Sequence, residues 1–157
     1  MKIDVTDLQD ITPIDSKAIR RAARAALGDM LGCYSVVLVD DEQISKLNQQ
    51  YLGRDAATDV MAFPFKDAPL TADDCAGEIV VSAQRAFVEA RERGLDVGAE
   101  LALYVVHGAL HLAGFDDADA PHAAEMHDKE KDILAQLGYD VSRLWKPLKS
   151  LSRTDGR

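Results

Sequence analysis

The stretch Glu100-Leu-Ala-Leu-Tyr-Val-Val-His107-Gly-Ala-Leu-His111-Leu-Ala-Gly114-Phe-Asp-Asp117 joins an apolar helical segment to a cluster of metal-ligand side chains. Apolar residues fall on nearly every side of a helix over 100–113, which predicts a central, buried helix. His107 and His111 are four residues apart, so they project from one side of that helix, one turn from each other. Gly114 allows the helix to end and the chain to turn sharply.

This pair of histidines is a candidate metal site, with Asp117 as the third ligand. Two same-face imidazoles can chelate one ion, and the turn at Gly114 can bring the aspartate back to them. Three protein ligands with an open fourth position are typical of catalytic zinc. Zinc is therefore the expected ion, although nickel, iron or manganese suits the same ligands. The competitors of Asp117 as third ligand are Asp116, Asp119, His122 and His127, with His122 as the reserve ligand. We expect His122 and His127, on the next helix, to face solvent.

The ligand spacing also matches that of the metzincin peptidases, which place a glutamate directly after the first histidine as general base. That position is Gly108 here, so the base is missing and proteolysis is disfavoured. Among the other acidic residues, Asp116 is a candidate partner for orienting an imidazole. Glu125 and Glu130 are interpreted as part of an acidic, solvated helix face.

The composition is that of a soluble globular protein, with 47% hydrophobic and 29% charged residues in a chain of 157. We expect one domain over residues 1–149 and a polar tail over 150–157. No apolar run approaches the ~20 residues that cross a bilayer, and no signal-peptide segment follows Met1. The expected location is the cytoplasm. Cys33 and Cys75 lie far apart in sequence without CxxC spacing, so we expect two free thiols.

A net charge of -9 repels a phosphate backbone at long range, so a nucleic-acid partner requires a local basic patch. The candidate patch lies at helical spacing on the first helix and comprises Lys17, Arg20, Arg21 and Arg24. We interpret it first as a solvated helix face.

Hydrophobic patterning predicts a small α+β domain in which a sheet of about four strands packs against several helices. Strands are expected at 3–5, 34–39, 60–63 and 79–81. Thr12 is the expected cap of a helix that begins at Pro13 and ends near Gly28 or Gly32. Further helices are expected over 42–51, from Ser82 to Gly94, from about Val97, and from Pro121 to Gly138. Residues 66–76 form an expected exposed connection between strands.

Three blocks of the sequence resemble the YbeY family of bacterial endoribonucleases. The family signature H-G-x-L-H-L-x-G-Y-D-H corresponds to 107–117 of this chain. The block L-N-x-x-Y-R-G-K-D-x-x-T-D-V-L-S-F-P-F corresponds to 47–65, and G-D-I-V-I-S corresponds to 77–82. The resemblance implies a small α+β fold with a mixed sheet and a zinc site at the end of its central helix. It also implies endonucleolytic cleavage of single-stranded RNA in ribosomal RNA maturation and ribosome quality control.

The implied partners are ribosomal RNA and ribosomal proteins, with no membrane involved and the oligomeric state left open. Three departures from the family pattern stand out. Asp117 replaces the third histidine, and a carboxylate reduces the net positive charge of a zinc site without excluding the metal. Leu52 replaces an arginine, for which Arg54 is the candidate substitute as a phosphate contact. Ala62 replaces a serine.

In the resulting hypothesis, the ion polarises a phosphate oxygen or supplies bound hydroxide as nucleophile, and attack by the RNA 2′-hydroxyl is equally open. No side chain is assigned as general base or acid. Thr58 and Asp59 either turn the chain before a strand or line the cleft. Trp145 could stack on a base, but its simpler role is a packing anchor. The alternative function is a ribosome- or protein-associated factor with a structural metal and little catalysis of its own.

Overall fold

In the computed structural model, which describes residues 1–53, 59–65 and 71–144, four strands form a mixed sheet in the order β1-β2-β4-β3. Strands β1, β2 and β4 are parallel, and β3 runs antiparallel along β4. Proline ends β3 at an edge of the sheet, where its missing N–H costs no ladder bond. The strands are β1 (Lys2–Asp7), β2 (Cys33–Val39), β3 (Val60–Pro64) and β4 (Cys75–Ser82). The α+β class and the mixed four-stranded sheet are thus confirmed.

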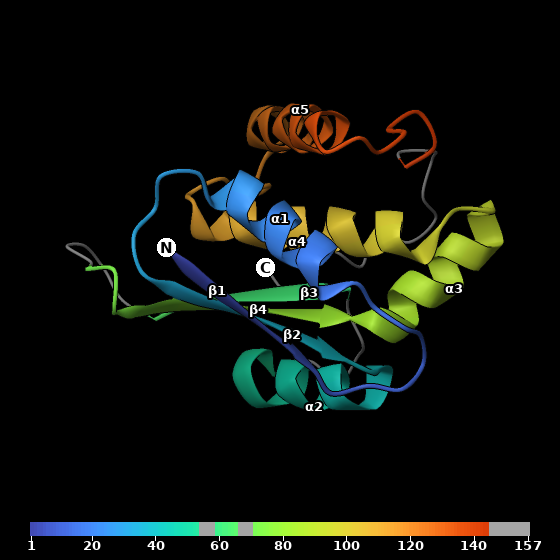
Figure 1. Cartoon of the computed structure of the whole chain (residues 1–157), viewed down its shortest axis with the longest axis horizontal. Helices are drawn as coiled ribbons and strands as arrows, with labels where there is room; N and C mark the ends of the chain where they lie inside the picture. Colours follow the sequence, from blue (N-terminus) through green and yellow to red (C-terminus); the bar gives the residue numbers. More distant parts are fainter. Residues whose placement is uncertain (54–58, 66–70, 145–157) are drawn as a thin grey trace.

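In the described part of the chain, five helices cover the two faces of the sheet (Figure 1). Helices α1 and α4 pack on one face, α5 lies outside them, and α2 covers the opposite face. Helix α3 leads from the end of β4 into α4. None of the helices in the described ranges is long and apolar enough to span a membrane. The helices are α1 (Ser16–Leu27), α2 (Asp41–Leu52), α3 (Ala83–Arg93), α4 (Val97–Leu112) and α5 (Ala120–Gln136).

Helix α4 is the centre of the main core, as its apolar pattern predicts. Its residues are buried without a break from Glu100 to Leu110 because the sheet, α1, α3 and α5 all contact it. Gly108 allows a close approach to the sheet: a Cβ there would lie 2.7 Å from Ile79 Cγ2 and 3.0 Å from Val60 Cγ2. The packing therefore fixes the rotation of α4, and with it the direction in which the histidines project.

The first helix begins later than the sequence suggests. Asp15, not Thr12, is the N-cap, and its carboxylate accepts hydrogen bonds from the backbone N–H groups of Lys17 and Ala18. The Gln9 side chain holds the preceding turn, because it accepts from Thr12 N–H and donates to Thr12 O. That bonding keeps the Thr12 backbone outside the helix, so Asp15 takes the capping position.

The other helices begin close to their predicted first residues. Asp40 forms a capping box with Gln43 at the start of α2, and Ser82 and Asp119 cap α3 and α5. The connection expected over 66–76 is shorter, because β4 begins at Cys75. Residues 145–157, which include Trp145 and the predicted tail, lie outside the described residues.

Candidate metal centre

The C-terminal end of α4 turns the chain back onto the histidines. Gly114 has a φ of +105°, a value that favours glycine. Its N–H donates to His111 O, and the N–H of Phe115 donates to Leu110 O, which closes the last turn. The sharp turn expected at this glycine is present, and it carries Asp117 back over the helix end.

Three potential ligand side chains meet at this end of α4. The Nε2 atoms of His107 and His111 are 3.2 Å apart. The Asp117 carboxylate lies 3.7 Å from His107 Nε2 and 3.9 Å from His111 Nε2. All three side chains are largely buried, with exposed fractions of 6%, 14% and 20% in sequence order. The structure therefore brings together the residues that the sequence singles out, and the group could hold a divalent metal ion.

The spacing of these atoms fits a common ion. Two imidazole nitrogens bound to one tetrahedral zinc at ~2.0–2.1 Å lie about 3.3 Å from each other. The observed separation of the two Nε2 atoms is 3.2 Å, so both histidines already have suitable positions. The carboxylate must approach by a few tenths of an ångström to complete the set. In addition, imidazole nitrogens and a carboxylate oxygen are ligands that zinc accepts readily.

Glu130 is a further member of the site, and the prediction that it lies on a solvated helix face is wrong. Its side chain is 3% exposed and its carboxylate is hydrogen-bonded to Nδ1 of His107. A carboxylate at Nδ1 holds the proton there and leaves Nε2 free to bind a metal. Helical spacing in α5 is the sequence feature that could have indicated this burial. Glu130 lies four residues after buried Met126 and four before buried Leu134, so all three lie on one side of the helix.

The remaining polar candidates lie outside the group. His122 is exposed, as expected, and its ring bonds the Asp119 carboxylate, so it does not join the ligands. His127 is only partly exposed, with Nδ1 3.9 Å from Glu130 Oε1. The role proposed for Asp116 is wrong, because this exposed carboxylate accepts from the Ala118 N–H while Glu130 contacts the imidazole.

The positions around β3 can be placed only in part. Arg54 and Thr58 fall outside the described residues. Asp59 is buried, and its carbonyl accepts the Ser82 N–H, which ties the start of β3 to the end of β4. Leu52 is an exposed apolar side chain at the last residue of α2. It offers a phosphate no charged contact where the family pattern has an arginine.

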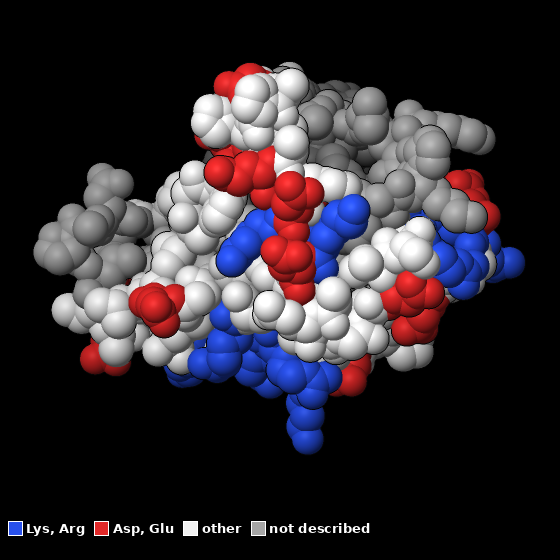
Figure 2. Space-filling model, turned by 90° about the horizontal axis from the view of Figure 1, so that it is seen from above, with Lys and Arg blue, Asp and Glu red and all other residues white. Residues whose placement is uncertain are grey.

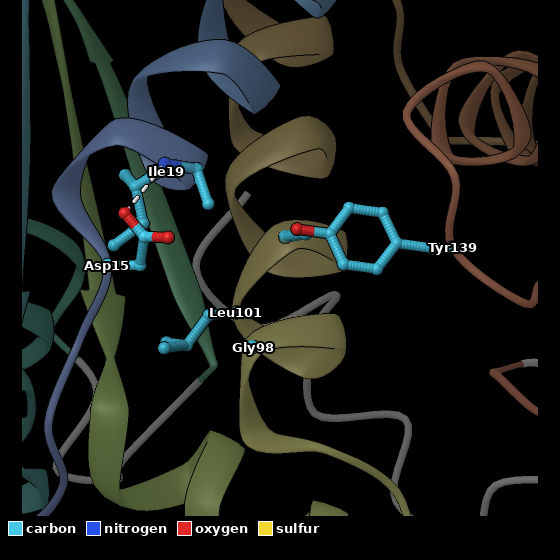
Figure 3. A pocket seen from close by; sticks show the side chains of 7 residues that line it. Asp15, Ile19, Gly98, Leu101 and Tyr139 are labelled. Atoms are coloured by element: carbon cyan, nitrogen blue, oxygen red, sulfur yellow. Dashed lines mark hydrogen bonds between the residues drawn. The ribbon is translucent and has the colours of Figure 1, made fainter.

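A separate hollow lies toward the other end of α4 (Figure 3). The Tyr139 ring points into it from beyond α5, opposite Ile19 of α1 and the N-cap residue Asp15. Its floor includes Gly98, which is about 14 Å along the helix from His107. The side chains that line this hollow are mostly apolar, so it is distinct from the histidine cluster and lacks comparable ligand groups.

On the face seen from above, acidic side chains form a central band, and basic side chains flank this band and also gather along the lower edge and at the right (Figure 2). The exposed acidic residues of α5 are Glu125, Asp128 and Asp132. The exposed basic residues of α1 are Lys17, Arg21 and Arg24. Two α1 arginines also have structural roles, because Arg20 donates to Ile3 O and Arg24 to Met1 O. The basic face of α1 therefore helps to fix α1 against β1.

Comparison with known proteins connects this geometry to a family. The sequence profile of the family described as Endoribonuclease YbeY matches residues 4–138. The chain belongs to the YbeY endoribonuclease family. A Carboxydothermus hydrogenoformans protein named Endoribonuclease YbeY is 34% identical over 142 residues, which cover 87% of this chain and 98% of that protein. One from Azorhizobium caulinodans is 39% identical, covering 78% of this chain and 80% of its own.

The fold agrees with that of a Thermotoga maritima protein known from a solution structure. The TM-score is 0.59 with 29% identity, over 86% of this chain and 88% of the other. Membership of the YbeY family supports an RNA-cleaving role for this chain. Family membership also disfavours the peptidase alternative, and the structure disfavours it further. A side chain at position 108 would point at the sheet and could not act as a general base beside a metal ion.

Proposed function

We propose that this protein is a metal-dependent, single-strand-specific endoribonuclease that acts in ribosomal RNA maturation and ribosome quality control in the cytoplasm. The observation that carries the proposal is the meeting of His107, His111 and Asp117 at the end of the buried helix of a YbeY family member. The family supports the cleavage of RNA, and the ligand group supports the dependence on a metal.

The three side chains would hold one divalent ion, with zinc as the expected metal. When bound, such an ion supplies Lewis acidity toward a phosphate oxygen and lowers the pKa of water in its coordination sphere. His107 would bind through Nε2 because Glu130 keeps the proton on Nδ1. Asp117 contributes negative charge, so the centre should be less electrophilic than one with a third histidine.

The decisive experiment measures cleavage of single-stranded RNA by purified protein with and without the ligand side chains. His107→Ala and His111→Ala should each lose metal in elemental analysis and lose RNA cleavage. His122→Ala is the matched control, because this histidine is exposed and bonded to Asp119 outside the group. The proposal fails if His107→Ala cleaves RNA as fast as the wild type in preparations free of other nucleases.

Position 117 allows a second test of the ligand set. Asp117→Ala should weaken metal binding, whereas Asp117→His should preserve or strengthen it because imidazole is also a good zinc ligand. If neither variant changes metal binding, the third ligand lies elsewhere. The cleavage products then separate two chemistries: a 2′,3′-cyclic phosphate indicates attack by the RNA 2′-hydroxyl, and a 5′-phosphate indicates attack by water.

A noncatalytic role on the ribosome is the competing function, favoured by the net charge of -9 and by the exposed Leu52. It predicts that the purified protein binds metal and ribosomal particles but leaves RNA intact. The same cleavage assay separates the two functions. Binding without cleavage under metal-replete conditions would replace the nuclease proposal.

A further inference from the structure

The two cysteines, distant in sequence, lie opposite each other in the sheet. Cys33 begins β2 and Cys75 begins β4, and the two residues are register partners in these neighbouring parallel strands. Adjacent strands are ~4.8 Å apart, which lies inside the Cα–Cα range that a disulfide spans. Both thiols are free in the structure.

A β-bulge places both side chains on the same face of the sheet. The register shifts after the cysteine pair, so that Tyr34 lies opposite Gly77 and Ala76 is the extra residue. Ala76 and Gly77 both face the α4 side, since Ala76 belongs to that core and a Cβ at Gly77 would meet Leu112. Cys75 therefore faces the other side, and so does Cys33, which precedes the buried Tyr34 of the same core.

The segment before β4 holds the Cys33 residue against Cys75. The Cys33 N–H donates to Asp74 O at 2.7 Å, and its thiol lies 3.4 Å from Ala72 O. A tight turn closed by Asp74 N–H to Thr71 O supports this arrangement. Cys75 is exposed and Cys33 is partly exposed, so a dissolved oxidant can reach the pair.

We propose that Cys33 and Cys75 form an inter-strand disulfide when the protein meets a small-molecule disulfide such as oxidised glutathione. The exposed Cys75 loses its proton to water, and its thiolate attacks one sulfur of the oxidant, which releases one glutathione thiolate. The Cys33 thiolate then attacks the Cys75 sulfur of this mixed disulfide and expels the second glutathione. The two protons lost by the cysteines balance the two taken up by glutathione, and the two-electron oxidation of the cysteines matches reduction of one oxidant disulfide.

The disulfide would join β2 to β4 at the end of the sheet that lies near the metal centre. Gly77, two residues after Cys75, faces Leu112, which directly follows His111. The bond would thus fix the β4 bulge that supports the end of α4. This modification site does not depend on the proposed nuclease activity, and its test does not use that activity.

Intact-mass spectrometry of the full chain after incubation with oxidised glutathione tests the proposal. The folded wild type should lose about 2 Da, the mass of two hydrogens, with little bound glutathione at equilibrium. Cys33→Ser and Cys75→Ser should instead each gain a single glutathione, about 305 Da. Peptide mapping should then find Cys33 linked to Cys75 in the wild type.

A reaction with protein unfolded in guanidinium chloride serves as the control for proximity. The ring-closing step should be at least about tenfold slower there, because a loop of about 40 residues must first close. The proposal is overturned if the folded wild type ends with two glutathiones or forms a disulfide-linked dimer. It is equally overturned if folded and unfolded chains close the ring at the same rate.

Discussion

The two ends of α4 each carry buried charged groups, but these groups are arranged in opposite ways. Toward the N-terminal end, the Arg93 guanidinium donates to Glu100, to Glu89 and to the Leu144 carbonyl, at 2.8–3.1 Å. At the C-terminal end, two imidazole nitrogens and the Asp117 carboxylate face one another at 3.2–3.9 Å. The first cluster is built around an arginine, whereas the second is built from imidazole and carboxylate groups of the kind that bind a metal ion.

This difference separates a structural cluster from a candidate binding site, although both contain buried ionisable groups. The Glu100 carboxylate forms a buried ion pair with Arg93, and that arginine joins α3 to α4 and to the segment after α5. Two imidazole nitrogens and a carboxylate that converge on one point can instead bind an added cation. The direction of the electron pairs is therefore more informative than burial when a site is sought in this fold.

The largest expected effect on stability is at the N-terminal cluster. Arg93→Ala should lower the free energy of unfolding by about 3–5 kcal/mol, because Glu100 would stay buried without its cation. Urea unfolding followed by circular dichroism measures the change. Lys46→Ala is the control: its partner Glu42 and the lysine itself are exposed, so the loss should be below about 1 kcal/mol. Equal losses in the two variants would contradict a structural role for the buried cluster.

Glu130 offers the corresponding test at the other end of the helix. Glu130→Ala should weaken metal affinity by roughly 10–100-fold, because His107 loses the partner that orients its ring. Glu130→Gln should recover part of the loss, since the amide oxygen can still accept from Nδ1–H. Glu125→Ala, an exposed change on the same helix, is the control. Competition with a chromophoric chelator gives the affinities, and an unchanged value for Glu130→Ala would remove Glu130 from the site.

The packing between the clusters can be tested at Gly108. Gly108→Ala should cost about 1–3 kcal/mol, because the added methyl overlaps Ile79 on the sheet. Gly98→Ala in the same helix is the control, since its new methyl would meet only the exposed Asp96 side chain. Thermal and urea unfolding should separate the two variants. A Gly108→Ala protein as stable as the control would mean that α4 does not depend on this contact.

The smallest expected effect concerns pH and the exposed His122. Its hydrogen bond with Asp119 raises the pKa of His122 above 6.5, and the His122 backbone and side chain lower the pKa of Asp119 below 3.8. The contribution of His122 to the free energy of unfolding is complete below the pKa of this histidine in the unfolded chain. It is lost as the pH rises through the raised pKa of the folded state. The contribution of Asp119 to the free energy of unfolding is present above pH 3.8, and it is lost as the pH falls through the lowered pKa of the folded state.

An NMR titration of the histidine ring protons checks this pair. The midpoint of His122 should lie above 6.5 in the wild type. Asp119→Ser keeps a helix-capping side chain but removes the charge, so the midpoint should return toward 6.5. A midpoint that is the same in both proteins would show that the pair does not form in solution.

The sequence contains enough information to predict the ligand group because local geometry determines most of it. Helical spacing places His107 beside His111, and the glycine turn limits where Asp117 can lie. The burial of Glu130 was not predicted because its neighbours in the sequence are mostly charged. It is buried because it lies on the side of α5 that carries the other buried residues of this helix. The α1 cap was misplaced because Gln9, outside the helix, decides between Thr12 and Asp15. The Gln9 bonds are local, but they depend on the conformation of one side chain, and the burial of α5 depends on tertiary packing; helical spacing specifies neither.

The central claim, that one divalent ion binds at the C-terminal end of α4, can be tested directly by anomalous diffraction at the zinc absorption edge. A crystal of the wild-type protein equilibrated with zinc should show a single peak about 2.0–2.2 Å from His107 Nε2, His111 Nε2 and the Asp117 carboxylate. Zinc bound only elsewhere, for example between Cys33 and Cys75, with these three side chains unliganded, would contradict the account.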